Sequence, residues 1–150
     1  MIMRPTVDPN NFKFSEDIQV RWTDLDPLAH VNNSIYIQYF EIARGRYMLQ
    51  ASPSWDWHKD MFLLANINCS YLQELKIGMP KTKCWVRTKE MGKKSFVLEY
   101  MITTDDKTVH TVGTSIQVMF DTKNKTTIEI PDWLRNELMA YEKEGSIEIK

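Results

Sequence analysis

The side chains best suited to chemistry are concentrated between residues 23 and 34 of this 150-residue chain. This stretch reads TDLDPLAHVNNS and contains two aspartates, one histidine and two asparagines. A carboxylate or an imidazole can attack a carbonyl carbon or activate water. Hydrogen-bond donors nearby can stabilise the negative charge that develops during such an attack. The stretch therefore contains the kinds of group that an active site needs, and the surrounding elements must hold them in place.

The run that follows is predicted to be a long helix over residues 34–50. It contains no proline, and it begins beside Asn32, Asn33 and Ser34, which are all good N-cap residues. Its apolar side chains occupy nearly every face, which is typical of a buried helix. We therefore predict that this helix, roughly 25 Å long, runs through the middle of the protein. Gly45 lies inside the helix and predicts a close backbone contact there.

The remaining elements are predicted mostly from alternating apolar residues. The expected strands cover residues 14–23, 61–72, 81–89, 95–104 and 108–120, and the first dozen residues form an irregular arm. Turns are expected at IGMP, EMGKK and TTDDK, so that the later strands follow one another at hairpin spacing. Residues 131–143 are predicted to form a short helix whose buried stripe is Trp133, Leu134, Leu138 and Tyr141.

These elements predict an α+β fold in which an antiparallel sheet surrounds a long central helix. The chain length suits a single domain over residues 1–150, with its core at about 14–142. One helix can be covered on all sides only if the sheet curls around it or a second subunit closes the open side. The pattern therefore also favours an oligomer.

Composition excludes several classes of protein. A formal net charge of −1, with both signs mixed along the chain, argues against a nucleic-acid-binding protein. No window approaches the ~18 apolar residues of a membrane span, and the N-terminus has no signal-peptide pattern. Cys69 and Cys84 are too few for a disulfide framework, and we expect them to be reduced. These features predict a cytoplasmic protein with no membrane or nucleic-acid partner.

The order of these segments resembles the hotdog-fold thioesterases, most closely the 4-hydroxybenzoyl-CoA and acyl-CoA thioesterase branch. The resemblance rests on a strand ending in TDLDP, then HVNN, then FEIAR in the helix. It continues through ANINCSYLQELKIGMP, GKKSFVLEYMI and IPDWL, and covers most of residues 15–140. It implies a hotdog fold and hydrolysis of an acyl-CoA by a homodimer or homotetramer.

The resemblance also implies roles for individual residues. Asp26 would be the nucleophile or the general base, and backbone amides near Asn33 and Ser34 would form the oxyanion hole. Asp26 could alternatively be a turn residue before Pro27, and Asp24 is expected to be structural. His30 could orient the loop or contact the thioester, and Asn32 and Asn33 could cap the helix as well as contact substrate. Tyr36 is expected to line the pocket or the core.

A second cluster comprises Lys93, Lys94 and Ser95. The resemblance implies that basic residues in this hairpin bind the phosphates of CoA, often across a subunit interface, whereas an isolated pair of lysines would be a solvated turn. Trp55 and Trp57 follow the helix and are expected to pack structurally, with a lid over the acyl pocket as the alternative. No phosphate-binding loop, GxSxG elbow or metal-ligand spacing occurs, and His30, His58 and His110 are scattered. No metal or redox cofactor is implied.

Two other functions remain open from the sequence. The same chemistry could act on an acyl carrier protein, since HVNN also occurs in the plant-type acyl-ACP branch, although that branch usually has two fused hotdog domains. The chain could also be a non-catalytic hotdog protein that binds acyl groups. The retention of Asp26 with the helix-start asparagines argues against this second possibility. A hotdog dehydratase fits less well, because those enzymes arrange a histidine and an acid differently.

Overall fold

The computed structural model describes residues 5–105 and 108–150. Two short 3₁₀ turns, η1 (Pro9–Asn11) and η2 (Trp22–Asp24), accompany the regular elements. In chain order these elements are β1 (Phe14–Asp17), α1 (Asn33–Ala51), β2 (Phe62–Tyr71), β3 (Lys83–Met91), β4 (Ser95–Thr104), β5 (Thr108–Asp121), β6 (Thr126–Thr127), α2 (Asp132–Tyr141) and β7 (Glu148–Ile149). The turn expected at TTDDK falls partly on residues 106–107, which lie outside the described residues.

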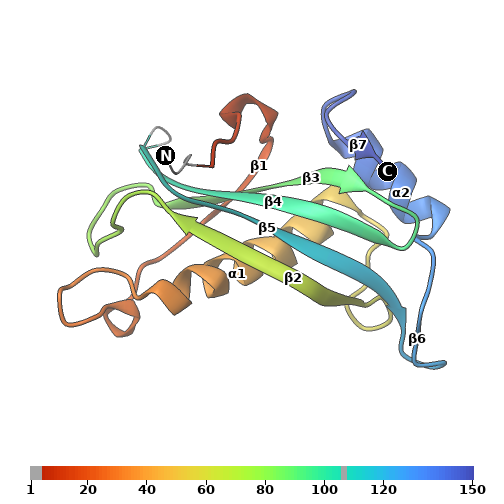
Figure 1. Cartoon of the computed structure of the whole chain (residues 1–150), viewed down its shortest axis with the longest axis horizontal. Helices are drawn as coiled ribbons and strands as arrows, with labels where there is room; N and C mark the ends of the chain where they lie inside the picture. The colour runs from red at the N-terminus through yellow and green to blue at the C-terminus, as the bar shows by residue number, and fades with distance from the viewer. Residues whose placement is uncertain (1–4, 106–107) are drawn as a thin grey trace.

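The main strands form one antiparallel sheet in the order β1-β3-β4-β5-β2. The two-residue strands β6 and β7 are added to β5 and, in parallel, to β3. The sheet curls around α1, and β2 runs along its outer edge beside the helix (Figure 1). This confirms the predicted α+β fold, and it is the arrangement that the resemblance to hotdog proteins implies.

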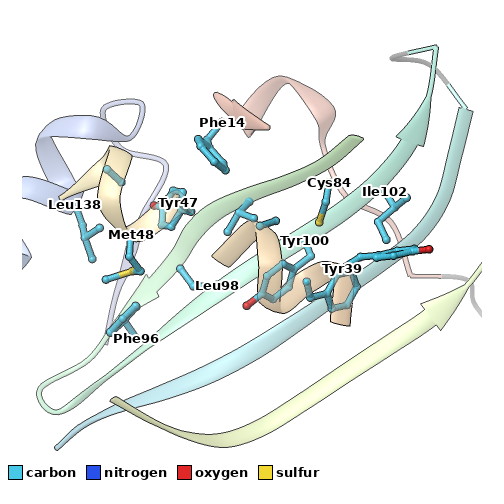
Figure 2. Close-up of a cluster of buried hydrophobic side chains, with 14 of the residues drawn as sticks. Phe14, Tyr39, Tyr47, Met48, Cys84, Phe96, Leu98, Tyr100, Ile102 and Leu138 are labelled. Atoms are coloured by element: carbon cyan, nitrogen blue, oxygen red, sulfur yellow. The ribbon is translucent and has the colours of Figure 1, made fainter. Parts of the chain in front are cut away.

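The core lies between α1, the inner face of the sheet and α2. Figure 2 shows this cluster, in which Tyr39, Tyr47 and Met48 of α1 face Phe96, Leu98 and other side chains of the strands. Phe40 stacks on Tyr100 of β4 with ring centroids 4.4 Å apart. The predicted stripe of α2 is confirmed, because Leu134 and Leu138 are fully buried while Trp133 and Tyr141 pack at the margin.

The prediction that α1 is buried on every side was wrong within one chain. The sheet covers only one side of the helix, so that Ile42 is 53% exposed and Leu49 is 46% exposed. Gly45 also lacks the predicted close contact, because an added Cβ would meet no described atom within 4 Å. A tight backbone approach occurs instead at Gly113 of β5, where a Cβ would clash with the backbone carbonyl of Asn68 and lie 2.7 Å from the Phe40 ring.

The first strand is shorter than predicted. It ends at Asp17, and the chain then turns through η2, leaving Trp22 78% exposed. The turn forms because the buried carboxylate of Asp24 accepts a hydrogen bond from the Arg21 amide at 3.0 Å. The alternation of apolar and polar residues therefore continues beyond the end of the strand, into a segment where the backbone amide of Arg21 binds a side chain and not another strand.

The predicted apolar face of β5 lies on the outer side of the sheet. The inner side carries Gly113, Ser115, Gln117 and Met119, which are buried against the core. In β4, by contrast, the apolar alternate residues do face inward, as predicted: Phe96, Leu98, Tyr100 and Ile102. The small and polar inner residues of β5 leave room for the aromatic rings of α1.

Candidate active site

A buried aspartate anchors the polar stretch. Asp24 is 1% exposed, and its carboxylate accepts hydrogen bonds from the Arg21 guanidinium at 2.9 Å and from the Tyr39 hydroxyl of α1 at 2.6 Å. Burial by itself raises the pKa of Asp24, but the hydrogen bonds from Tyr39 and Arg21 outweigh it and lower that pKa below its usual value. The Asp24 carbonyl also accepts the Asn32 amide at 2.9 Å. Asp24 thus fixes both ends of the loop, as its expected structural role requires.

Asp26 lies at the opening of this loop. Its Oδ1 accepts the backbone amides of Leu28 at 2.9 Å and His30 at 3.1 Å, while the Asp26 amide donates to the His30 carbonyl at 2.8 Å. These bonds form a turn of the kind that aspartate favours. No described group donates to Oδ2, and the residue is half-buried. One carboxylate oxygen therefore holds the loop while the other is available.

The start of α1 is capped, but one amide is left over. The Asn32 side chain accepts the Ser34 amide at 3.0 Å, and the Asn32 carbonyl accepts the Ile35 amide at 2.9 Å. The expected cap is confirmed for Asn32, and the amide of Ser34 is already occupied by it. Among the described residues, no group accepts the amide of Asn33, which is the first residue of the helix. This amide carries the positive end of the helix dipole and is the donor best placed for an oxyanion.

His30 is paired with a residue that the sequence had not singled out. Its Nε2 lies 3.2 Å from Oε2 of Glu74, which belongs to the loop after β2. The backbone of the same loop bridges to His30 at Lys76, and the Leu75 carbonyl accepts the Val31 amide. The loop after β2 therefore returns to the loop that contains Asp26 and His30, and it orients the imidazole. No local pattern could have found Glu74, because its approach depends on the curl of the sheet.

A pocket of about 270 Å³ brings these groups together. Tyr36 and Tyr71 form one wall with their rings 5.1 Å apart, and the Tyr71 hydroxyl donates to the Asn33 carbonyl at 2.8 Å. Burial, with a contribution from Cys69, raises the pKa of Tyr71 to about 12, so this hydroxyl stays protonated near neutral pH. The pocket is lined by Asp26, His30, Val31, Asn33, Tyr36, Tyr71, Leu72, Gln73 and Glu74.

Larger hollows occur elsewhere on the described surface. Two of them, of about 780 and 550 Å³, flank residues 17–21 and contain none of Asp26, His30 and Asn33. We therefore place the candidate site in the smaller pocket, where an available carboxylate and an unpaired helix amide occur together.

Lys93, Lys94 and Ser95 do not lie near this pocket within one chain. Lys93 and Lys94 lie in the turn between β3 and β4, and Ser95, the first residue of β4, pairs with Val118 of β5, next to the Phe62 end of β2. The pocket lies at the Tyr71 end of β2, at the opposite end of the sheet (Figure 1). Lys93 is instead paired with Glu129 at 3.2 Å. A contact between this turn and a substrate at Asp26 would need a second copy of the chain.

Trp55 and Trp57 are also at the far end of α1. Trp55 is 4% exposed and packs against Phe62 and Trp133, with ring distances of 5.7 and 6.5 Å. The indole of Trp57 donates to the Gly45 carbonyl at 3.4 Å. The structural role expected for the pair is confirmed, and neither ring covers the pocket of its own chain.

Metal sites and membrane-spanning helices are absent from the described residues. Among residues 5–105 and 108–150, no group of three or more histidine, cysteine, aspartate or glutamate side chains is placed to hold a metal ion. No helix in this part of the chain is long and apolar enough to cross a membrane. Cys69 and Cys84 are unpaired thiols in strands, and burial raises the pKa of Cys69 to about 11.

The sequence of the chain is similar to those of two bacterial proteins. The chain is 29% identical over 125 residues to the long-chain acyl-CoA thioesterase FadM of Escherichia coli, covering 81% of this chain and 93% of FadM. It is also 28% identical over 91 residues to the uncharacterised protein YsmA of Bacillus subtilis. That match spans 61% of the length of each protein.

Solved structures show the same architecture. A thioesterase from Thermus thermophilus, solved with coenzyme A and zinc, superposes with a TM-score of 0.77 and 29% identity, covering 88% of this chain and 96% of the other. The probable thioesterase YbaW of Escherichia coli gives a TM-score of 0.72 at 25% identity, covering 87% and 100%. These matches show that the curled sheet and central helix form a hotdog thioesterase fold.

A family model also matches most of the chain. The model of the thioesterase-like superfamily matches residues 20–138, which include the loop of Asp26, all of α1 and the four long strands. A match over most of the chain, together with the shared fold, establishes the family. The chain is a member of the thioesterase-like superfamily, with the hotdog fold.

Proposed function

We propose that this protein is an acyl-CoA thioesterase, which hydrolyses the thioester of an acyl-CoA to the free acid and CoA. The observation that carries the proposal is the pairing of an available carboxylate oxygen on Asp26 with the unpaired amide of Asn33 in one pocket. The similarity to FadM and to a thioesterase solved with coenzyme A supports CoA as the carrier.

The chemistry follows from these two groups. The thioester carbonyl would lie at the start of α1, where the Asn33 amide stabilises the oxyanion of the tetrahedral intermediate. Asp26 would either attack the carbonyl carbon, giving a mixed anhydride that water then hydrolyses, or take a proton from the attacking water. Both routes release CoA as its thiol. His30, held by Glu74, lies close enough in the same pocket to position the water or the thioester.

The site is completed, in our proposal, by a homodimer. Strand β2 is an edge strand of ten residues, and Leu63 and Leu64 on it are 41% and 42% exposed. A long apolar edge of this kind favours pairing with another strand. If two β2 edges pair antiparallel about a two-fold axis, the Tyr71 end of one copy lies beside the Phe62 end of the other. The turn with Lys93 and Lys94 of the second copy then approaches the Asp26 pocket and can bind the phosphates of CoA.

The first experiment measures thiol release from short, medium, long and aromatic acyl-CoAs. Asp26→Asn is expected to lower kcat by at least ~100-fold, a scale typical of losing a general base or nucleophile, because it removes the charge and keeps the turn. Asp121→Asn is the matched control, since the Asp121 carboxylate accepts two amides in a similar turn and does not line the pocket. A no-substrate blank corrects for Cys69 and Cys84.

The control variant should retain wild-type activity. If Asp26→Asn is as active as wild type, the assignment of Asp26 is wrong. If wild type is inert towards every CoA ester but releases acid from an acylated carrier protein, the carrier has been misassigned. If both kinds of thioester stay intact, the proposed activity itself fails.

A further inference from the structure

Arg44 on α1 is a buried cation without a described counter-ion. Its side chain is 9% exposed, and among the described residues no carboxylate lies within 4.0 Å of its guanidinium. Its one described hydrogen bond runs from Nη1 to the Tyr100 hydroxyl at 3.2 Å. An arginine remains charged at any physiological pH, and burying a charge without an opposite charge is costly. The single chain thus leaves Arg44 incompletely satisfied.

The remaining donors of Arg44 reach the surface of the chain. Among the described residues, the fully buried side-chain nitrogen and oxygen atoms without a partner belong to Trp55, Thr111 and Glu142. Nε and Nη2 of Arg44 have no described acceptor and are not among these buried atoms. Part of the guanidinium edge therefore remains accessible to solvent.

Arg44 lies on the flank of α1 that faces the edge strand. The Arg44 guanidinium sits 6.0 Å from the ring of Phe62, at the start of β2, while Tyr36 meets Tyr71 at the other end of the same strand. Helix α1 and strand β2 therefore run side by side in opposite directions (Figure 1). Any copy that pairs with the β2 edge brings its own α1 towards this flank.

An exposed carboxylate lies one turn before Arg44 on the same helix. Glu41 is three residues earlier, so it borders the same flank of α1, and on its other side it lines the hollow beside residues 17–21. Glu41 is exposed, and no ion pair or hydrogen bond is described for its side chain. The flank thus carries one cation and one anion that do not pair with each other within the chain.

We propose that these charges pair between subunits, with Arg44 of each copy bound to Glu41 of the other across the two-fold axis. This inference rests on the homodimer of the proposed function. A two-fold axis turns the facing helices antiparallel and makes every contact reciprocal, so a 44-to-41 contact is accompanied by a 41-to-44 contact. The interface would therefore contain two identical ion pairs and leave neither arginine without a counter-ion.

Charge reversal tests this pairing, with the oligomeric state measured by sedimentation velocity. Glu41→Arg places two cations opposite each other in a homodimer, and Arg44→Glu places two anions opposite each other. Each variant alone is expected to raise the dissociation constant of the dimer by roughly tenfold or more. When the two variants are mixed in equal amounts, they can form a heterodimer. In it, one 44-to-41 contact is the native ion pair, and the other is an ion pair with the two charges exchanged. The dimer should therefore return.

A matched control reverses a charge on another face of α1. Arg46 is an exposed residue whose guanidinium lies 4.0 Å from Glu16 of β1, away from the edge strand. Arg46→Glu should leave the dimer unchanged. A neutral series guards against misfolding of Arg44→Glu: after Glu41→Gln, the further change Arg44→Met should weaken the dimer much less than it does in wild type.

The outcomes separate the two proposals. A wild-type protein that is monomeric at micromolar concentration overturns the homodimer, whether or not the pocket hydrolyses thioesters. A dimeric wild type whose Glu41→Arg and Arg46→Glu variants are equally dimeric overturns the ion pair alone. The ion pair is also overturned if both reversed variants fold, as judged by thermal unfolding, and remain monomeric when mixed.

Discussion

Two aspartates only two residues apart have opposite surroundings. Asp24 is buried and accepts hydrogen bonds from Arg21 and Tyr39, whereas Asp26 is half-buried with one oxygen available. The difference arises because the Asp24 side chain turns inward to α1 while Asp26 turns towards the pocket. The same residue type therefore stabilises the loop at one position and can perform chemistry at the other.

Asp24→Asn should lower the free energy of unfolding by about 2 kcal/mol, because it leaves charged hydrogen bonds incomplete in a buried place. The folded-state pKa of Asp24 is depressed, so its contribution is present above the usual value of 3.8 and is lost as the pH falls through the lower folded value. Urea unfolding at several pH values should show the difference from wild type shrinking in strong acid. Arg46→Gln, which removes an exposed ion pair, should cost under ~1 kcal/mol. A pH-independent loss for Asp24→Asn would contradict this account.

Glu142 presents the opposite case. It is buried, accepts the Tyr47 hydroxyl at 2.6 Å with one oxygen, and leaves the other oxygen without a described partner. Burial raises its pKa above the usual 4.5, although hydrogen bonds from Tyr47 and Thr88 oppose the shift. Its contribution to stability is therefore full below pH 4.5 and falls as the pH rises through the folded value.

Glu142→Gln should consequently gain stability relative to wild type as the pH is raised from 4 to neutrality. Thermal unfolding of both proteins across this range measures the change. Asp121→Asn, in a surface turn, serves as the control and should show no such gain, since the pKa of Asp121 is lowered by hydrogen bonds from its own turn. A constant difference between Glu142→Gln and wild type would contradict the raised pKa.

At the scale of elements, two glycines have contrasting roles. Gly113 lies where β5 passes beneath α1, with no space for a Cβ beside Phe40, whereas Gly45 lies on α1 with open space around it. The first glycine sets how closely the helix can approach the sheet. The second merely lowers helix propensity.

Gly113→Ala should destabilise the fold by about 1–3 kcal/mol, because the added methyl group clashes with the backbone carbonyl of Asn68 on β2 and overpacks the contact with Phe40. Gly45→Ala is the matched control and should stabilise the fold by up to ~1 kcal/mol, since alanine favours the helix interior. Denaturant unfolding of the two variants gives both signs in one experiment. Equal effects at the two positions would show that packing under α1 does not limit the approach of the sheet.

The sequence predicted local structure well and tertiary placement less well. The helices and the four long strands follow from periodicity, and Asp26, Asn32 and Asn33 were found through a family resemblance. The sequence could not reveal that Ile42 and Leu49 stay exposed, because the side that a sheet covers is a property of the whole fold. Nor could it reveal Glu74, which meets His30 only after the chain has passed through β2.

At the scale of the whole molecule, the active site is proposed to draw on two subunits. Asp26 and Asn33 come from one copy, while Lys93 and Lys94 would come from the other. This division can be tested without a structure of the complex, because a heterodimer of an Asp26 variant and a Lys93/Lys94 variant would regain one intact site.

Asp26→Asn should be inactive, and the double variant Lys93→Ala with Lys94→Ala should have a raised KM for acyl-CoA. A mixture of the two, refolded together, is expected to exceed the mean activity of the separate proteins at low substrate concentration, since one site per heterodimer has all its groups. Mixing Asp26→Asn with His30→Ala is the control and should give no such gain. Asp26 and His30 of any one site come from the same copy, so each site of this heterodimer still lacks either Asp26 or His30. Strict additivity in the first mixture would place the lysines outside the site.

The position of Tyr71 would tie the proposed catalysis to protein concentration. Its ring lies on the open edge strand β2, yet its hydroxyl holds the Asn33 carbonyl at the start of α1. A strand edge that is unsupported in the monomer would thus loosen the first turn of the helix that must hold the oxyanion. Dilution below the dissociation constant of the dimer would then lower the activity per subunit. The total rate of hydrolysis would therefore rise more than linearly with enzyme concentration.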